Sequence, residues 1–318
     1  MAMRKLRLIP DDTHIRFMWL RRYTLPASIL LSIASVLMFI FIGPNYGIDF
    51  RGGTLIEMKP LQENYSIADI RQTLAGLNLG DVQVTEVSDL GGDTSVLIRI
   101  QQQDGGEGEQ QVAIERVTEA FGDTVEFRRV EIVGPRVSGE LAYTATIALT
   151  VTLLAILAYI WFRFEWQFAI GAIVSTIHDV LLTLGFFVVA GLDFNLASIA
   201  AILTIVGYSL NDTVVVYDRI RENLRKFKKM PLSELIDRSI NDTLARTTMT
   251  SVTTVLALLA LLIFGGSVIR SFIAAMLFGV IIGTYSSIYI AAPMLIYFGL
   301  RRAPSKEGEA GAGEAAEA

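Results

Sequence analysis

The sequence predicts a polytopic α-helical membrane protein with six transmembrane helices and a ferredoxin-like α+β periplasmic domain between the first two. Composition is the first reason, because 52% of the 318 residues are hydrophobic and only 19% are charged, which is more apolar than a soluble domain needs. The second reason is that the apolar residues gather into six runs, each near the roughly 20 residues that a helix needs to cross a membrane. The runs cover residues 25–42, 141–161, 168–190, 194–217, 247–265 and 271–298.

The first run, residues 25–42, follows a basic segment and in this respect is similar to a signal peptide. Its carboxyl end reads FIGPN, which offers no small-x-small cleavage site. We therefore expect this run to be retained as the first span.

Lysines and arginines predict the orientation, because basic loops stay in the cytoplasm. The bases at residues 16–22 precede the first run, Arg163 separates the second from the third, and those at 219–229 and 301–302 follow the fourth and the sixth, so these bases fall on one side. Both termini are therefore expected in the cytoplasm, as residues 1–24 and as a disordered tail at 301–318 that is rich in Glu, Gly and Ala. Residues 43–140 are expected in the periplasm, and residues 141–300 form a five-helix membrane domain. With no cysteine in the chain, the periplasmic domain must be held by its own core.

Residues 43–140 alternate short strands with short helices. A capping hydroxyl and an acidic first turn predict a helix that starts at Ser66, and a Gly-rich turn at residues 89–93 predicts a hairpin. The expected order is β-α-β-β-α-β, a ferredoxin-like split βαβ unit. This segment has no His, no Cys and no glycine phosphate loop, so we expect a binding or mechanical module. The strands are expected at residues 54–59, 82–87, 95–100 and 125–133, and the second helix at 111–121.

A carboxylate lies within the fourth run, where residues 206–223 read VGYSLNDTVVVYDRIREN. An ionisable group at bilayer depth costs about 2.5 to 3.5 kcal/mol on insertion scales, so it usually faces the bundle interior and serves a pathway. Tyr208 and Ser209 lie one turn before Asp212 and continue a polar stripe, and Asn211 adjoins it. A carboxylate that only locks helices together is the alternative, but serine or asparagine would do so at lower cost. We therefore expect Asp212 to be functional.

The third run holds a second ionisable pair, His178 and Asp179, with Ser175 and Thr183 each one turn from the acid. Histidine titrates near neutral pH, which suits a proton relay. Adjacent helix positions point about 100° apart, however, so the two side chains need not act together. We favour a satisfied interior histidine for His178 and leave relay and structural roles equally open for Asp179. No metal site is expected, because the other histidine is His14, in the amino-terminal segment.

Arg246 directly precedes the fifth run, and six of the next eight residues carry hydroxyls. One helix face carries Arg246, Thr250, Thr253 and Thr254. This pattern predicts a hydroxyl-lined stripe able to hold water, with a permanent cation at its cytoplasmic end. A topogenic arginine with helix-packing threonines explains the charge well but explains so many hydroxyls less well. A cation near a helix amino terminus needs an acid to answer it, and Asp212 at the cytoplasmic end of the preceding span is the expected partner.

Two further patterns concern helix packing. Residues 231–245 keep apolar residues at helical spacing after Pro231, which predicts an amphipathic helix on the cytoplasmic membrane surface. In the sixth run Gly279 and Gly283 form a G-x-x-x-G pattern, which indicates a close helix contact.

Four segments resemble the SecF family of the bacterial protein-export machinery, within the resistance-nodulation-division superfamily. They are residues 47–54 (GIDFRGGT), 133–135 (VGP), 206–223 and 246–254 (RTTMTSVTT), and the resemblance extends over nearly the whole chain. Two departures lie outside the predicted spans. Arg51 replaces a small hydroxyl residue that the family usually has, and Arg136 stands where lysine is usual.

The resemblance implies a subunit of the bacterial inner membrane that is not an enzyme. It implies a complex with SecD, which supplies another six-span half, beside the SecYEG channel and with YajC as a further candidate partner. Preproteins are the implied cargo, and protons that enter from the periplasm, carried by Asp212 and Arg246, are the implied energy source. Contacts with membrane lipids are expected, and no cofactor or nucleic acid. Candidate relay or supporting residues are His178, Asp179, Tyr208, Ser209, Asn211, Thr250, Thr253 and Thr254.

Two other functions fit parts of the sequence. A half-transporter that exports a small molecule or lipid by proton antiport would use the same buried acid, although such pumps usually carry much larger exported domains. An intramembrane protease would pair Ser209 with His178, or Asp179 with Asp212. The sequence GYSLN around Ser209 lacks the closing glycine of a nucleophile motif, and neither aspartate has a Gly-x-Gly-Asp context.

Overall fold

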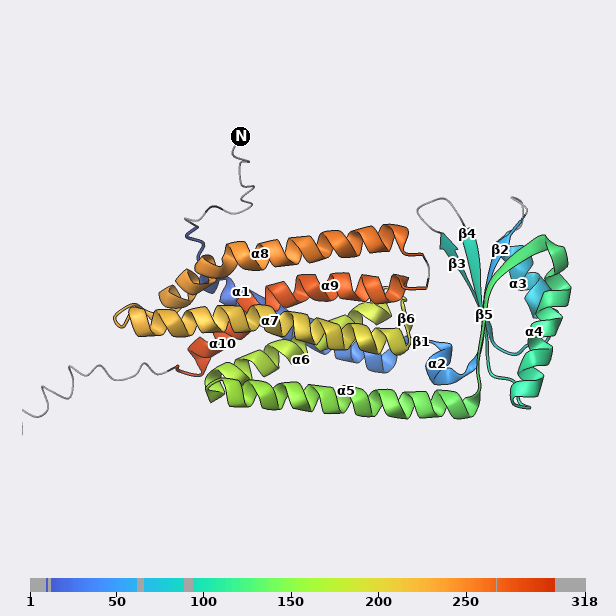
Figure 1. Cartoon of the computed structure of the whole chain (residues 1–318), viewed down its shortest axis with the longest axis horizontal. Helices are drawn as coiled ribbons and strands as arrows, with labels where there is room; N and C mark the ends of the chain where they lie inside the picture. Colours follow the sequence, from blue (N-terminus) through green and yellow to red (C-terminus); the bar gives the residue numbers. More distant parts are fainter. Residues whose placement is uncertain (1–9, 11–12, 62–65, 89–93, 267, 301–318) are drawn as a thin grey trace, which may run out of the picture.

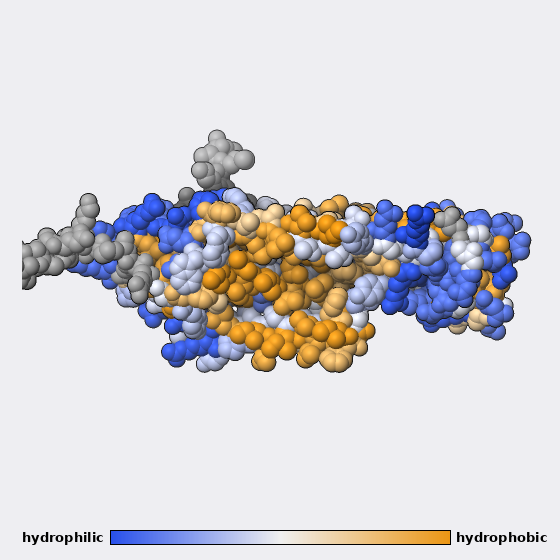
Figure 2. Space-filling model, turned by 90° about the horizontal axis from the view of Figure 1, so that it is seen from below, coloured by the Kyte–Doolittle hydropathy of each residue, from blue (hydrophilic) through white to orange (hydrophobic). Residues whose placement is uncertain are grey.

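The computed structural model describes residues 10, 13–61, 66–88, 94–266 and 268–300. A bundle of long helices and an α+β domain follow one another along its long axis (Figure 1). Among the described residues, six helices are long and apolar enough to cross a membrane. On the face drawn in Figure 2, hydrophobic residues cover the middle of the bundle, while hydrophilic residues gather at its far end and over the α+β domain. The fold class expected from the sequence is confirmed.

The bundle consists of helices that alternate in direction. α1, α6 and α8 run toward the α+β domain, and α5, α7 and α9 run away from it (Figure 1). We call the end of the bundle remote from the α+β domain the distal end; the described basic residues that predicted the cytoplasmic side lie there. The helices are α1 (Phe17–Phe41), α5 (Pro135–Arg163), α6 (Trp166–Val189), α7 (Leu196–Lys226), α8 (Leu232–Phe264), and a last span built from α9 (Arg270–Ser286), the π-helical turn η2 (Ser287–Ala291) and α10 (Ala292–Tyr297).

The α+β domain has the predicted β-α-β-β-α-β order. Its antiparallel sheet has the strand order β3-β4-β2-β5, and a core of buried residues such as Ile56, Ile70, Ile98 and Val117 packs the helices on it. Ser66 caps the first helix in a reciprocal capping box with Asp69. The elements are β2 (Gly53–Pro60), α3 (Ile67–Ala75), β3 (Val82–Ser88), β4 (Thr94–Ile100), α4 (Glu107–Phe121), η1 (Gly122–Thr124) and β5 (Val125–Val133). The hairpin turn expected at 89–93 and the tail expected at 301–318 lie outside the described residues.

The segment at residues 231–245 is helical from Leu232 on, as predicted, but its apolar face packs on protein and not on a membrane surface. It is the first half of α8, which continues without a break through the fifth apolar run. Its apolar residues Leu235 and Ile236 are fully buried in the bundle core, and Asn223 of α7 donates a hydrogen bond to Ser239 at 2.9 Å. The reason is that α7 extends to Lys226, past its own apolar run, and so offers this segment a protein partner.

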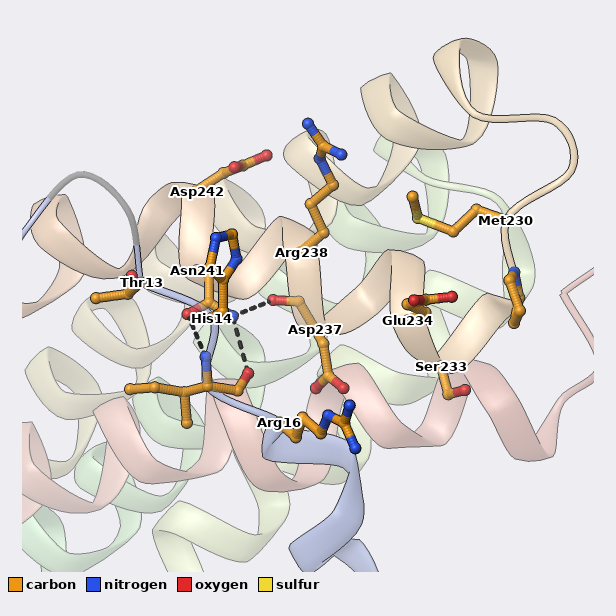
Figure 3. Close-up of a pocket in the computed structure, with 12 residues that line it drawn as sticks. Thr13, His14, Arg16, Met230, Ser233, Glu234, Asp237, Arg238, Asn241 and Asp242 are labelled. Carbon is orange, nitrogen blue, oxygen red and sulfur yellow. Dashed lines mark hydrogen bonds between the residues drawn. The ribbon is translucent and has the colours of Figure 1, made fainter.

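The amino-terminal segment docks on this same part of α8 (Figure 3). The main-chain nitrogen of Ile15 donates to Oδ1 of Asn241 at 3.0 Å, and Nδ2 of Asn241 donates to the Ile15 carbonyl at 2.9 Å. Asp237 accepts from the main-chain nitrogen of Met18 at 2.8 Å. These bonds fix the start of α1, and a pocket of about 680 Å³ remains between the segment and α8.

Glycines allow α9 to approach α7 closely, as the G-x-x-x-G pattern predicted. A side chain added at Gly279 would collide with Ile205, and a Cβ at Gly283 would lie 3.0 Å from the Cβ of Ser209. This contact brings α9 against the middle of α7, where the candidate site residues lie.

Candidate functional site

Asp179, near the middle of α6, is completely buried and joins three helices. Its Oδ2 accepts hydrogen bonds from Ser209 of α7 at 2.5 Å and from Ser286 of α9 at 2.7 Å. Its Oδ1 lies 2.9 Å from Nδ1 of His178. Because a buried carboxylate is tolerated only when it is bonded, these three contacts are what allow it to remain there. We call these four residues the Asp179 cluster.

His178 is bonded on one side of its ring only. Its Nδ1 contacts Asp179, while its buried Nε2 has no hydrogen-bond partner among the described residues. The ring lies 6.3 Å from that of Tyr285, whose hydroxyl bonds Ser28 of α1 at 2.9 Å. Within the Asp179 cluster, His178 is therefore the residue whose ring lies nearest to Tyr285.

Asp212 lies near the middle of α7, is 3% exposed, and so faces the interior of the bundle. Its Oδ2 has no hydrogen-bond partner in the part of the chain that the structure describes. The same is true of three buried hydroxyls, those of Ser175 on α6, Thr213 on α7 and Thr247 on α8. Buried polar atoms are normally bonded to protein or to ordered water. Ordered water is the expected partner of such atoms.

Arg246 on α8 has an exposed side chain and makes no ion pair with the described residues. No direct bond between Arg246 and Asp212 is therefore seen among the described residues, and their expected partnership stays a prediction. Both residues lie near the middle of their helices, because α7 and α8 continue well past the apolar runs.

The hydroxyls of the stripe expected on α8 form their hydrogen bonds within the same helix. Each of three hydroxyls donates at 2.8 Å to a carbonyl three or four residues earlier on α8: those of Thr250, Thr253 and Thr254. Thr253 is also exposed. These hydroxyls form no bond with Asp212.

A different α8 hydroxyl reaches across the bundle. Ser251 lies 2.6 Å from the hydroxyl of Thr284 on α9, and the hydroxyl of Tyr208 on α7 approaches Ser251 at 3.5 Å. Tyr208 and Ser209, expected to serve Asp212 together, therefore have separate partners. Sequence spacing missed Ser251, Thr284 and Ser286, because serines and threonines within apolar runs show no sign of which helix they will face.

One face of α7 is left uncovered by the bundle. Asn211 is exposed there, and a Cβ added at Gly207 would meet nothing within 4 Å. The exposed residues recur every three or four positions, as Ala200, Thr204, Gly207 and Asn211. Small residues allow close helix packing in membranes, and an amide facing hydrocarbon is costly. We call these four residues the open face of α7.

The α+β domain is bonded to the turn between α6 and α7. Short strands β1 (Asn45–Tyr46) and β6 (Asp193–Phe194) pair in parallel. Arg99 of β4 forms an ion pair with Asp193 at 2.9 Å and donates to Asn45 at 2.9 Å, and Asn45 donates to Asp193 at 2.6 Å. We call these three residues the domain latch.

A second bond ties the domain directly to the helix that carries Asp212. In the short helix α2 (Ile48–Arg51), Asp49 accepts from the main-chain nitrogen of Leu196, the first residue of α7, at 2.9 Å. An acid at a helix amino terminus satisfies a free N–H and complements the helix dipole.

The geometry assembles neither protease site. Ser209 donates to Asp179, and His178 bonds the other oxygen of the same carboxylate, so serine and histidine do not pair. Asp179 and Asp212 share no hydrogen bond among the described residues.

Among the described residues, six helices able to span a membrane, a docked α+β domain and buried ionisable groups define a polytopic membrane protein. The family described as "Protein export membrane protein SecD/SecF, C-terminal" matches residues 113–301, and the SecD/SecF GG motif matches residues 37–60. The chain belongs to this SecD/SecF family, which confirms the resemblance seen in the sequence.

Relatives match the chain along its whole length. Protein translocase subunit SecF of Cereibacter sphaeroides is 46% identical over 96% of this chain and 97% of its own length, and that of Rhodobacter capsulatus is 47% identical over 95% and 94%. Protein translocase subunit SecDF of Brucella abortus is 46% identical over 96% of this chain. The match covers only 40% of that longer relative.

Two solved structures share the fold. The crystal structure of SecDF from Thermus thermophilus, a translocon-associated membrane protein, matches 92% of this chain and 40% of its own with a TM-score of 0.81 and 36% identity. SecDF in a super-membrane-facing form matches 96% of this chain and 40% of its own at the same identity, with a TM-score of 0.66. The present conformation is thus nearer to the first of these two structures.

Proposed function

We propose that this chain is a SecF-type subunit of the bacterial Sec translocase and uses the proton-motive force to promote preprotein translocation across the cytoplasmic membrane. The relatives support the first part. In each match to a translocase subunit named SecF, the alignment covers nearly all of this chain and nearly all of the relative. The alternative, a half-transporter for a small molecule or lipid, has no support among these relatives. The basic distal end lies in the cytoplasm and the α+β domain in the periplasm, in accord with the distribution of lysines and arginines.

SecD is the proposed partner within the membrane. The longer relatives named SecDF, of which this chain matches about 40%, support this pairing. The open face of α7 is the proposed contact, because its small residues admit a partner helix and its exposed amide needs one. The SecYEG channel, YajC and preproteins are the further proposed partners.

Asp212 is the proposed proton acceptor, and one observation carries this assignment. Its carboxylate is buried, is locked in no ion pair, and leaves one oxygen without a protein partner. Such a group can gain and lose a proton if water reaches it. Protonation removes the charge that Arg246 stabilises, so α7 and α8 can adopt a second packing.

The available energy is sufficient for a switch of this kind. One proton that crosses about 100 mV delivers about 2.3 kcal/mol, which shifts a two-state equilibrium roughly 40-fold. The Asp179 cluster has the supporting role in this proposal. The Asp179 carboxylate of α6 accepts hydrogen bonds from Ser209 of α7 and Ser286 of α9, so a movement of α7 is passed to α6 and α9. His178, with one free ring nitrogen, is the proposed link to water.

The test uses the chain coexpressed with SecD in inverted membrane vesicles that import a radiolabelled preprotein. Asp212→Asn should keep membrane insertion and SecD copurification but lose the part of import that an ionophore abolishes. Asp104→Asn, an exposed acid in the α+β domain, is the matched control and should retain that part. Undiminished gradient-dependent import by Asp212→Asn would refute the acceptor assignment. Failure of the unaltered chain to copurify with SecD, with proton-coupled efflux of a small molecule instead, would refute the translocase function.

A further inference from the structure

A basic pocket of about 610 Å³ lies at the distal end, between the last residue of α5 and the end of α7. Four cationic and two acidic side chains line it: Arg163, Arg221, Arg225, Lys226, Asp218 and Glu222. No part of the proton path proposed above uses these residues.

Two guanidinium groups converge in this pocket on one buried ring. Arg163 of α5 lies 4.8 Å from the centroid of Phe164, and Arg221 of α7 lies 5.7 Å from it. The ring is 6% exposed, so it holds both cations at a fixed place. Asp218 is shared between them, at 3.3 Å from Arg163 and 3.8 Å from Arg221. One carboxylate is thus the ion-pair partner of two cations.

The rest of the pocket adds two cations, Arg225 and Lys226, and one acid, Glu222. Glu222 is engaged by Arg219, outside the pocket, at 2.6 Å. Arg225 forms no ion pair with the described residues, and Lys226 lies over the ring of Phe227 at 5.5 Å. The pocket therefore presents an excess of cations to any anion that enters it.

The pocket lies beside a surface suited to lipid. Phe162 and Trp161, directly before Arg163 on α5, are 89% and 53% exposed, and Trp166 at the start of α6 is 49% exposed. Exposed aromatic residues at the end of a span are typical of the membrane interface. Only 11% of the apolar window of α5 is buried in the bundle, so lipid can reach the pocket along this helix.

We propose that this pocket binds the phosphate headgroup of an anionic phospholipid from the leaflet at the distal end. An arginine guanidinium can donate two parallel hydrogen bonds to the oxygens of one phosphate, and basic pockets between membrane helices are suited to such headgroups. The preference of bases for one side of the membrane explains their presence here. It does not require arginines from α5 and α7 to meet over one ring. The bound headgroup ties the thinly packed end of α5 to α7.

Native mass spectrometry of the full chain in detergent tests this, with phosphatidylglycerol and phosphatidylcholine added at equal concentration. Phosphatidylglycerol should be retained in preference. Arg221→Gln with Arg225→Gln should weaken its retention roughly 10- to 30-fold. Lys228→Gln with Lys229→Gln removes the same charge at the same end, outside the pocket, and should have little effect. Asp218→Asn should strengthen retention, because it frees both arginines.

Three results would overturn the proposal. Equal loss in both double variants would show attraction by overall charge without a site. Equal retention of the two lipids would remove the anionic preference. Displacement by inorganic phosphate or an acidic peptide at the same concentration as the lipid would show a soluble anion as occupant. Thermal unfolding of each variant without lipid checks the fold, and strengthened retention by Asp218→Asn supports the site even where the double arginine variant is unstable.

Discussion

Replacing Asp179 with alanine removes the acceptor for two hydroxyls, those of Ser209 and Ser286, and the partner of His178. Side-chain hydrogen bonds within membrane bundles contribute roughly 0.6 to 1.7 kcal/mol each in double-mutant cycles. Three of them give an expected loss of about 2 to 5 kcal/mol of unfolding free energy. Ser286 also donates to the Gly283 carbonyl at 3.1 Å, so Ser286→Ala alone should lie at the low end, near 0.6 kcal/mol.

Unfolding of the purified chain in mixed micelles, titrated with a denaturing detergent and followed by circular dichroism, measures these losses. Ser287→Ala is the matched control, because Ser287 is equally buried but bonds only the Thr284 carbonyl of its own span. It should change the unfolding free energy less than Ser286→Ala does. Asp179→Asn should lose less than Asp179→Ala, since its amide oxygen still accepts from both serines.

The reasoning fails if Asp179→Ala unfolds like the unaltered chain, or if Ser286→Ala and Ser287→Ala are indistinguishable. A double-mutant cycle between Ser209→Ala and Ser286→Ala adds a further check. Both hydroxyls bond the same oxygen, so their effects should not be additive.

Three other predictions follow from the contacts described. Arg246→Lys should keep most gradient-dependent preprotein import, and Arg246→Gln should lose it, because the proposed role of Arg246 needs its positive charge and no direct bond to Asp212. Equal loss of import in the two variants would instead show that the guanidinium geometry matters. Gly283→Val should cost about 1 to 3 kcal/mol in the same unfolding assay, because α7 packs against it, whereas Gly207→Val on the open face should cost less; equal costs would contradict the described α7–α9 contact. Arg99→Gln should broaden the distances between spin labels on α4 and α7 in pulsed electron paramagnetic resonance, and the exposed Arg116→Gln should not; unchanged distances in Arg99→Gln would show that the domain latch does not hold the domain.

Periodicity alone predicted most of the fold. Hydrophobic runs fix the number of spans, and alternation with turn residues fixes the order of elements in the α+β domain. Helix ends were harder to predict, because α7 continues through a charged segment to Lys226 and α8 begins at Leu232, far before its apolar run. Such segments are held as helices by each other, a tertiary effect that one-dimensional spacing does not contain.

The candidate site was predictable where a single residue is anomalous in itself. A lone carboxylate in an apolar run, such as Asp212, can be found from the sequence because its desolvation cost is independent of neighbours. The bond between Asp179 and Ser286 joins residues 107 positions apart, and the serine resembles other hydroxyls nearby. Arg99 and Asp193 resemble surface charges, and only the fold shows that they meet.

Helix α7 is unbroken from Leu196 to Lys226, and near its middle Ser209 is bonded to Asp179 of α6. At about 1.5 Å per residue, Leu196 lies roughly 20 Å from that point and Lys226 about 26 Å on the other side. A tilt of about 10° there carries the first residue of α7 by more than 3 Å, roughly the whole length of a hydrogen bond. Asp49 bonds Leu196, and Arg99 bonds Asp193 just before α7. A tilt of this size would therefore either break these bonds or move the α+β domain together with α7.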